Sequence, residues 1–215
     1  MSPTPSLAVA LALALATLSA PAARARTAPP TGTAWVGVRT GLAFIDSVSI
    51  DASSVESTSD PAPLFGVGAF WRTRRLDVGA FVEHIGSGRY QRLASKARIG
   101  SQIRAAAALR WRYVEQPWGG MYARLTPGLA IIRHSDTFRL DTADSVGVEL
   151  ADMDVRSFGF SMSFDLGLEV YVNSRVAVSA EFSLINTVTR LRRGAEDLDY
   201  NRVRGVFVVG LELRP

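Results

Sequence analysis

The clearest pattern in the chain is a strict alternation of apolar and polar side chains over residues 157–172. The even positions, from Phe158 to Val172, are all large and apolar, whereas the odd positions are small, polar or charged up to Tyr171. Successive side chains of a β-strand point to opposite faces, so this segment predicts a strand with one fully apolar face. A strand this much longer than the usual length of about 5–6 residues can cross a lipid bilayer.

Seven other segments alternate in the same way: residues 34–45, 64–72, 76–85, 101–113, 120–133, 176–185 and 203–213. Long polar connections alternate with short turns along the chain, and Pro127 predicts a bulge or a local break in its strand. An even number of strands with alternating long and short connections is typical of barrels in bacterial outer membranes. The sequence therefore predicts an all-β fold, an eight-stranded antiparallel up-and-down transmembrane β-barrel with its short turns in the periplasm.

Aromatic residues gather at the ends of the predicted strands that carry the short turns. Tryptophan and tyrosine are enriched where a membrane meets water. This placement predicts a periplasmic aromatic girdle formed by Trp35, Trp71, Trp111, Tyr113, Trp118 and Tyr171.

The start of the chain has a different composition from the predicted barrel. An apolar run over residues 7–20 is followed by Ala23-Arg24-Ala25, which fits the small-x-small pattern of a secretory cleavage site. We expect residues 1–25 to be a removed signal peptide, residues 26–33 a short periplasmic lead-in and residues 34–215 the barrel. The chain has no cysteine, so no disulfide or thiolate metal site is available to it.

The face that would line the barrel is rich in glycine, alanine and serine and also carries charges of both signs. An eight-stranded barrel is just wide enough to be filled by side chains, and buried charges need partners. We therefore expect a lumen filled by salt bridges among Arg39, Glu83, Arg104, Arg110, Arg124, Asp165, Glu169, Glu181 and Arg204, with Asp77, Arg112 and Glu212 on the same face. The alternative is a narrow pore for small solutes whose selectivity these charges set.

Strand pattern, loop alternation and a last strand with Phe207, Val209, Leu211 and Leu213 on one face together resemble the small eight-stranded outer-membrane barrels. That group includes the transmembrane domain of outer-membrane protein A and outer-membrane proteins X and W. The resemblance implies location in the cell outer membrane, contact with outer-membrane lipid and lipopolysaccharide, and recognition by the barrel-assembly machinery. A soluble lipocalin-like barrel is the alternative fold, but small side chains would solvate its exterior poorly.

Chemistry beyond binding has little support in the sequence. His134-Ser135-Asp136 contains the residue types of a hydrolase, but neighbouring residues of an extended strand point to opposite faces. The only other histidine is His84, and neither histidine lies in a His-x-x-His pattern. We therefore expect no enzyme, no metal and no cofactor, with an outer-membrane lipid hydrolase as the less favoured alternative.

Positive charge is dispersed along the chain, although the formal net charge is +4. Nucleic-acid-binding proteins gather such charge into patches, so no nucleic-acid partner is expected. Arginines near the predicted outer rim match the geometry of lipopolysaccharide phosphates, or are simply solvated: Arg133, Arg139, Arg190, Arg192 and Arg193. The sequence favours a structural or surface-interaction role and leaves the oligomeric state open.

Overall fold

The computed structural model describes residues 31–50, 53–57, 61–92, 95–133, 139–141, 147–149, 156–193 and 196–215. The predicted signal peptide, most of the lead-in and the His134-Ser135-Asp136 segment lie outside these residues. No described helix has the length and apolarity needed to cross a membrane.

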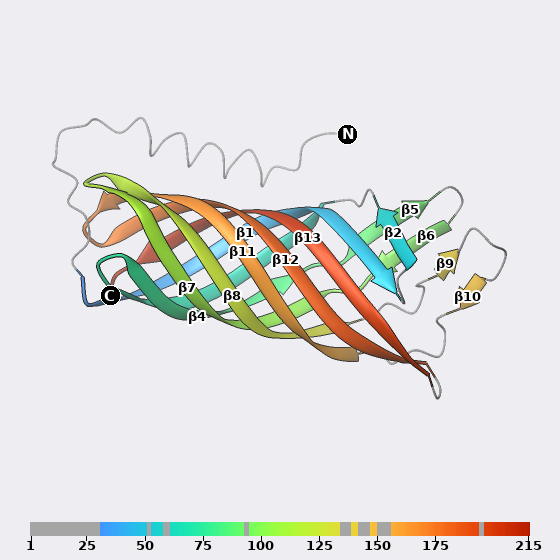
Figure 1. The fold of residues 1–215 in the computed structure, drawn as a ribbon. Coiled ribbons are helices and arrows are strands. Elements are labelled where there is room, and N and C mark those ends of the chain that lie inside the picture. The colour runs from blue at the N-terminus through green and yellow to red at the C-terminus, as the bar shows by residue number, and fades with distance from the viewer. Residues whose placement is uncertain are drawn as a thin grey trace.

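Eight long strands form a closed antiparallel barrel (Figure 1), which confirms the predicted fold class. They are β1 (Thr33–Ile50), β3 (Ala62–Arg72), β4 (Leu76–Ile85), β7 (Gln102–Gln116), β8 (Gly119–Arg133), β11 (Arg156–Asn173), β12 (Val176–Arg193) and β13 (Glu196–Leu213). Each pairs with the next along the chain, and β13 pairs with β1 to close the sheet. Closure leaves no unpaired edge around the wall, as a structure in hydrocarbon requires.

Five short strands lie at the end of the barrel opposite the C-terminus (Figure 1). They are β2 (Ser53–Ser57), β5 (Gly88–Arg92), β6 (Ser95–Ile99), β9 (Arg139–Asp141) and β10 (Gly147–Glu149). β2 extends the sheet by pairing with the last part of β1, while β5–β6 and β9–β10 are separate hairpins. The sequence predicted loops here, and that prediction was wrong because antiparallel backbone pairing needs no apolar face.

The second difference is the length of the last hairpin. Residues 186–201 were expected to be a loop, but β12 continues to Arg193 and β13 begins at Glu196. The expected local break at Pro127 is present on one side of β8: its register with β11 continues without a shift, but its ladder with β7 leaves Thr126 and Pro127 without a partner. Register shifts occur instead at Ala43/Ile45, Arg112/Val114 and Tyr171/Asn173.

The predicted alternation determines which side chains fill the barrel. In β11 the even residues from Phe158 to Val172 are on the outer face, and all of them are exposed except Val170, which is half-buried. The odd residues from Ser157 to Tyr171 are buried or nearly so. The same outward apolar face continues around the wall, with Val36, Val67 and Leu109 about half exposed. The barrel therefore presents apolar side chains to its surroundings and places its charged residues inside.

Candidate functional site

The lumen holds two networks of charged side chains, each with three arginines and three carboxylates. The turn-end network, near the short turns, consists of Arg72, Asp77, Arg110, Arg112, Glu169 and Glu212. The mid-barrel network consists of Arg39, Glu83, Arg104, Arg124, Asp165 and Glu181. Their side chains are at least nine-tenths buried, so two balanced sets of charge occupy the interior.

All three side-chain nitrogens of Arg110 are hydrogen-bonded within the turn-end network. Its Nε donates to Asp77 Oδ2 at 2.9 Å, and its two terminal nitrogens donate to the Glu212 oxygens at 2.7 and 2.9 Å. Arg112 reaches Asp77 from the next inward position of β7, with NH1 2.7 Å from Oδ1. These contacts join β4, β7 and β13 across the lumen, and the bidentate geometry is the strongest form of the arginine–carboxylate pair.

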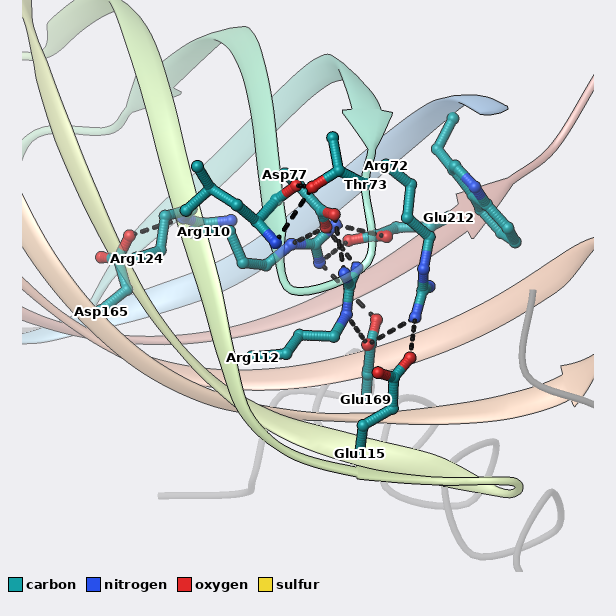
Figure 2. A network of polar contacts seen from close by, with 12 residues as sticks. Arg72, Thr73, Asp77, Arg110, Arg112, Glu115, Arg124, Asp165, Glu169 and Glu212 are labelled. Carbon is teal, nitrogen blue, oxygen red and sulfur yellow. Dashed lines mark hydrogen bonds and ion pairs between the residues drawn. The ribbon is translucent and has the colours of Figure 1, made fainter. Parts of the chain in front are cut away.

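Glu169 of β11 connects the rest of this network (Figure 2). Its Oε1 accepts hydrogen bonds from Arg112 Nε at 2.5 Å, from the Tyr171 hydroxyl at 2.8 Å and from Arg72 at 3.4 Å. Arg72 also contacts the Tyr171 hydroxyl and lies 3.6 Å from the half-exposed Glu115 at the rim. One carboxylate thus holds two arginines and a tyrosine from three strands.

The mid-barrel network is built around Arg124 and Glu181. Arg124 Nε donates to Asp165 Oδ2 at 2.7 Å, and Arg124 NH2 pairs with Glu181. On the other side of Glu181, Arg39 donates from NH2 at 3.3 Å and also lies 3.5 Å from Glu83. The pairs form a chain across the lumen from β8 and β11 through β12 to β1 and β4.

Arg104 completes the mid-barrel network with a mixture of charged and neutral partners. Its NH1 lies 3.2 Å from Glu83, and its NH2 donates to Ser163 Oγ at 3.0 Å and contacts Thr126. The hydroxyl groups therefore satisfy NH2, whereas Nε and NH1 make no hydrogen bond to a described residue and NH1 keeps only its ion pair with Glu83.

Phe81 lies among the three arginines of the mid-barrel network. The guanidinium carbons of Arg39, Arg104 and Arg124 are 5.0, 5.1 and 5.6 Å from its ring centroid. These distances are within the range of cation–π attraction. An aromatic ring therefore separates the three like charges and fills the space between them.

Tyr122 fills the lumen beside the turn-end network. The guanidinium of Arg110 lies between aromatic rings, 4.9 Å from the centroid of Tyr122 and 4.8 Å from that of Phe70. Gly167 of β11 provides the space, since a Cβ there would lie 2.6 Å from the Tyr122 ring. A small cavity nearby, lined by Arg39, Phe70, Phe81, Arg124, Glu181 and Glu212, has room for about one water molecule.

Beyond the mid-barrel network, toward the long connections, the lumen is filled by a different set of side chains. A buried apolar cluster covers the wall from β12 to β4, with members Ala43, Ala62, Leu64, Ile85, Ile185, Val206 and Val208. On the other wall, Gln102 donates to Thr187 at 2.9 Å and Thr187 donates to Ser161 at 3.1 Å. This part of the interior is thus packed by apolar and neutral polar groups.

All nine residues expected in the lumen lie on its inner face, and eight of them belong to the two networks. Arg204 is buried among the residues nearer the long connections, away from both networks. Arg72 was not among the predicted residues although it is buried and paired. Arg72 is at an even position of β3, as are the inward-facing Gly68 and Phe70, so the alternation of the strand would have predicted its burial.

The predicted aromatic girdle needs a correction at two positions. Trp35 and Tyr171 are buried inside the barrel, where Arg72 lies over both rings at 5.9 and 5.0 Å. Both residues are at odd-numbered positions, as are the inward-facing residues of their own strands. The alternation was therefore a better guide to their placement than their position near the turn end. The other four residues of the predicted girdle are exposed: Trp71, Trp111, Tyr113 and Trp118.

Catalytic and metal chemistry find little support in the described part of the chain. His84 is exposed on the outer face of β4, opposite Phe65. Within the described ranges, no three residues of the metal-binding types come close enough together to hold an ion. The arrangement that the lumen does offer is dense, neutral packing of paired charges.

Comparisons with known proteins agree with this architecture. The model of the outer membrane protein beta-barrel domain family matches residues 9–211. Among solved structures, the outer membrane protein OprG from Pseudomonas aeruginosa aligns with a TM-score of 0.53 and 11% identity, covering 87% of this chain and 98% of OprG. Neisserial surface protein A aligns with a TM-score of 0.52 and 12% identity, covering 85% and 97% of the two chains.

Identities this low establish a shared fold only, and no curated protein matches the chain in sequence. The family model, however, spans nearly the whole barrel, and the closed eight-stranded wall has the apolar exterior that such a family needs in the outer membrane. The chain therefore belongs to the family of outer membrane β-barrel domains.

Proposed function

We propose that this chain is a non-enzymatic outer-membrane barrel with a closed lumen, which acts as a rigid scaffold for the segments that it carries at the cell surface. The observation that carries the proposal is the pair of interlocked charge networks, three arginines against three carboxylates in each. A path for solutes would need some of these groups to face water rather than one another.

Opening the lumen would separate charges that have already lost their water. An unpaired buried charge is expensive, whereas a paired and hydrogen-bonded one is tolerated. The aromatic rings of Phe81, Phe70 and Tyr122 fill the gaps between the guanidinium groups, and the apolar cluster from β12 to β4 packs the next part of the interior. The closed lumen, in which the buried charges stay paired, therefore has a lower free energy than an open one.

The scaffold role is supported by the length of the last hairpin. β12 and β13 each have 18 residues, or about 60 Å of strand, and a tilt of about 40° leaves about 45 Å of height. The apolar band of such barrels is only about 25 Å tall, so the hairpin extends well beyond it. Arg190 and Asp199, an exposed pair 3.7 Å apart on its outer face, have the polarity expected outside the band.

The partners of the scaffold follow from its place in the envelope. A wall of outward apolar side chains has to be folded into the membrane, so we include the barrel-assembly machinery and the surrounding outer-membrane lipid, with lipopolysaccharide, among its partners. The extended β12–β13 hairpin and the short hairpins β5–β6 and β9–β10 supply the surface for other interactions. Binding residues are often found on segments that a rigid framework holds in place.

Single-channel conductance tests the closed lumen. The mature chain, refolded and inserted into a planar bilayer, is expected to produce no discrete current steps, and heat-modifiable migration on a gel would show that the barrel is folded. Steps that change in size in Glu181→Ala would contradict the proposal and support a narrow pore through the mid-barrel network. The small cavity beside Arg39 and Glu181 is the feature that such a pore would have to enlarge.

A further inference from the structure

Two exposed arginines lie opposite each other on the outer face of the barrel. Arg133 is the last residue of β8 and Arg156 is the first residue of β11, and the register pairs them directly. Side chains in this position have Cβ atoms about 4.5–5.5 Å apart. Both point away from the lumen at the end of the strands that carries the long connections.

This arrangement concentrates positive charge at one point of the rim. Like charges directly opposite each other destabilise a pair of strands. No carboxylate of the described part of the chain lies within ion-pairing distance of either guanidinium. An anion between the two groups would relieve the repulsion, and the planar fork of arginine matches a phosphate in a bidentate manner.

Directly below the two arginines, the same two strands present a strip of protruding apolar side chains. Ile131 pairs with Phe158 and Leu129 pairs with Phe160, all on the outer face. Phe158 and Leu129 are 75% and 71% exposed, more than the other large apolar residues of the outer wall, most of which are near 50%. These side chains therefore offer apolar surface to a neighbouring hydrocarbon chain.

We propose that Arg133 and Arg156 bind a phosphate of lipid A, the glycolipid anchor of lipopolysaccharide, while its acyl chains lie along Phe158 and Leu129. Charge and shape agree with this ligand, because an anionic headgroup with hydrocarbon chains needs a cationic rim above an apolar strip. The inference rests on the proposed orientation, in which the long connections face the outer leaflet. It does not depend on whether the lumen is closed.

Native mass spectrometry of the refolded mature chain in detergent micelles tests the site, with diphosphoryl lipid A as the probe. We expect R133A/R156A to bind lipid A about tenfold more weakly, since each lost charge-assisted contact removes a sizeable share of the affinity. The matched control is R74A/R175A, which removes two exposed arginines at the opposite end of the barrel. This control is expected to bind as the unaltered chain does.

Three further probes identify the ligand chemistry. Dephosphorylated lipid A and phosphatidylglycerol are expected to bind the unaltered chain more weakly than diphosphoryl lipid A, and excess inorganic phosphate is expected not to displace it. Equal binding of phosphatidylglycerol, or complete displacement by free phosphate, would overturn the assignment to lipid A. Equal binding of the dephosphorylated lipid would show that the phosphates contribute nothing, and would also overturn the proposal.

Unchanged lipid A affinity in R133A/R156A, or an equal loss in R74A/R175A, would also overturn the proposal. If the alanine variant does not fold, as judged by heat-modifiable migration, R133Q/R156Q removes the charge and keeps most of the side-chain length. The same tenfold loss is expected from it, and unchanged affinity would contradict the site. Conductance of these variants is expected to remain silent, so failure of the lipid site would be distinguishable from failure of the closed lumen.

Discussion

Each charged residue in the lumen is stabilised by particular partners, so its contribution depends on what remains when it is changed. Glu181 accepts from Arg124 and Arg39, and Glu169 accepts from Arg72, Arg112 and Tyr171. Removing one carboxylate leaves the arginines buried with one partner fewer. The penalty for an uncompensated buried charge is larger than the net gain from the intact pair.

Glu181→Gln tests this asymmetry in the mid-barrel network. The substitution keeps the shape of the side chain but leaves three arginines facing two carboxylates, so we expect the free energy of unfolding to fall by about 3–5 kcal/mol. Urea unfolding of the refolded chain, followed by tryptophan fluorescence, measures the loss. Asp199→Asn is the control, since the exposed Arg190–Asp199 pair should contribute nothing measurable. Equal shifts in the two variants would contradict the role of burial.

Two buried tyrosines provide a matched test of the hydroxyl contacts. The Tyr171 hydroxyl donates to Glu169 at 2.8 Å and contacts Arg72, so Tyr171→Phe should cost about 1–3 kcal/mol. The Tyr122 hydroxyl is buried and makes no hydrogen bond to any described residue. Tyr122→Phe is therefore expected to be neutral or slightly stabilising in the same unfolding measurement. The reverse order of the two variants would show that the hydroxyl contacts are assigned wrongly.

At the scale of the strands, the outward apolar face defines the depth of each residue in the bilayer. Leu166 lies in the middle of β11 and faces outward, whereas Val172 lies near its turn end. Arginine on the lipid face costs about 2–4 kcal/mol at the midplane and about 0–1 kcal/mol near the interface. We therefore expect Leu166→Arg to destabilise the barrel in lipid vesicles much more than Val172→Arg.

Unfolding of the same two variants in detergent micelles is the control, because a micelle has no bilayer midplane that would distinguish the two positions. The difference between Leu166→Arg and Val172→Arg should shrink when unfolding is measured in micelles instead of vesicles. Equal destabilisation in vesicles would place the membrane elsewhere on the wall.

The sequence predicted the strands that cross the bilayer and failed at the segments beyond it. Alternation in β11 is complete because lipid lies on one side and the crowded lumen on the other. Beyond the apolar band the outer face carries polar residues such as Asn186 and Arg190, while the inner face buries the neutral polar Thr187 and Thr189, so residues 186–201 lose the apolar–polar pattern although the backbone stays paired. The hairpins β5–β6 and β9–β10 also escaped prediction, because their short sequences show no long alternation of apolar and polar residues.

At the scale of the whole molecule, inward placement was predictable but the pairing was not. The alternation of odd and even positions predicted that the charged residues face inward. Applied to every strand, the same rule would also have placed Arg72, Trp35 and Tyr171 in the lumen. The division into two networks depends on the stagger between strands that are far apart in the sequence. Arg110 and Glu212, for example, meet across the barrel although they are 102 residues apart. Alternation within single strands contains no information on that stagger.

The central claim is that the lumen is a paired and neutral core, and a double-mutant cycle on Arg124 and Asp165 tests it most directly. Their Nε to Oδ2 distance is 2.7 Å, and both are buried. Each single alanine variant unbalances the mid-barrel network and should cost about 3–5 kcal/mol. The double variant leaves two arginines with two carboxylates, so its loss of unfolding free energy should be well below the sum of the single losses. Additive losses would contradict the account, because they would mean that the two charges do not compensate each other.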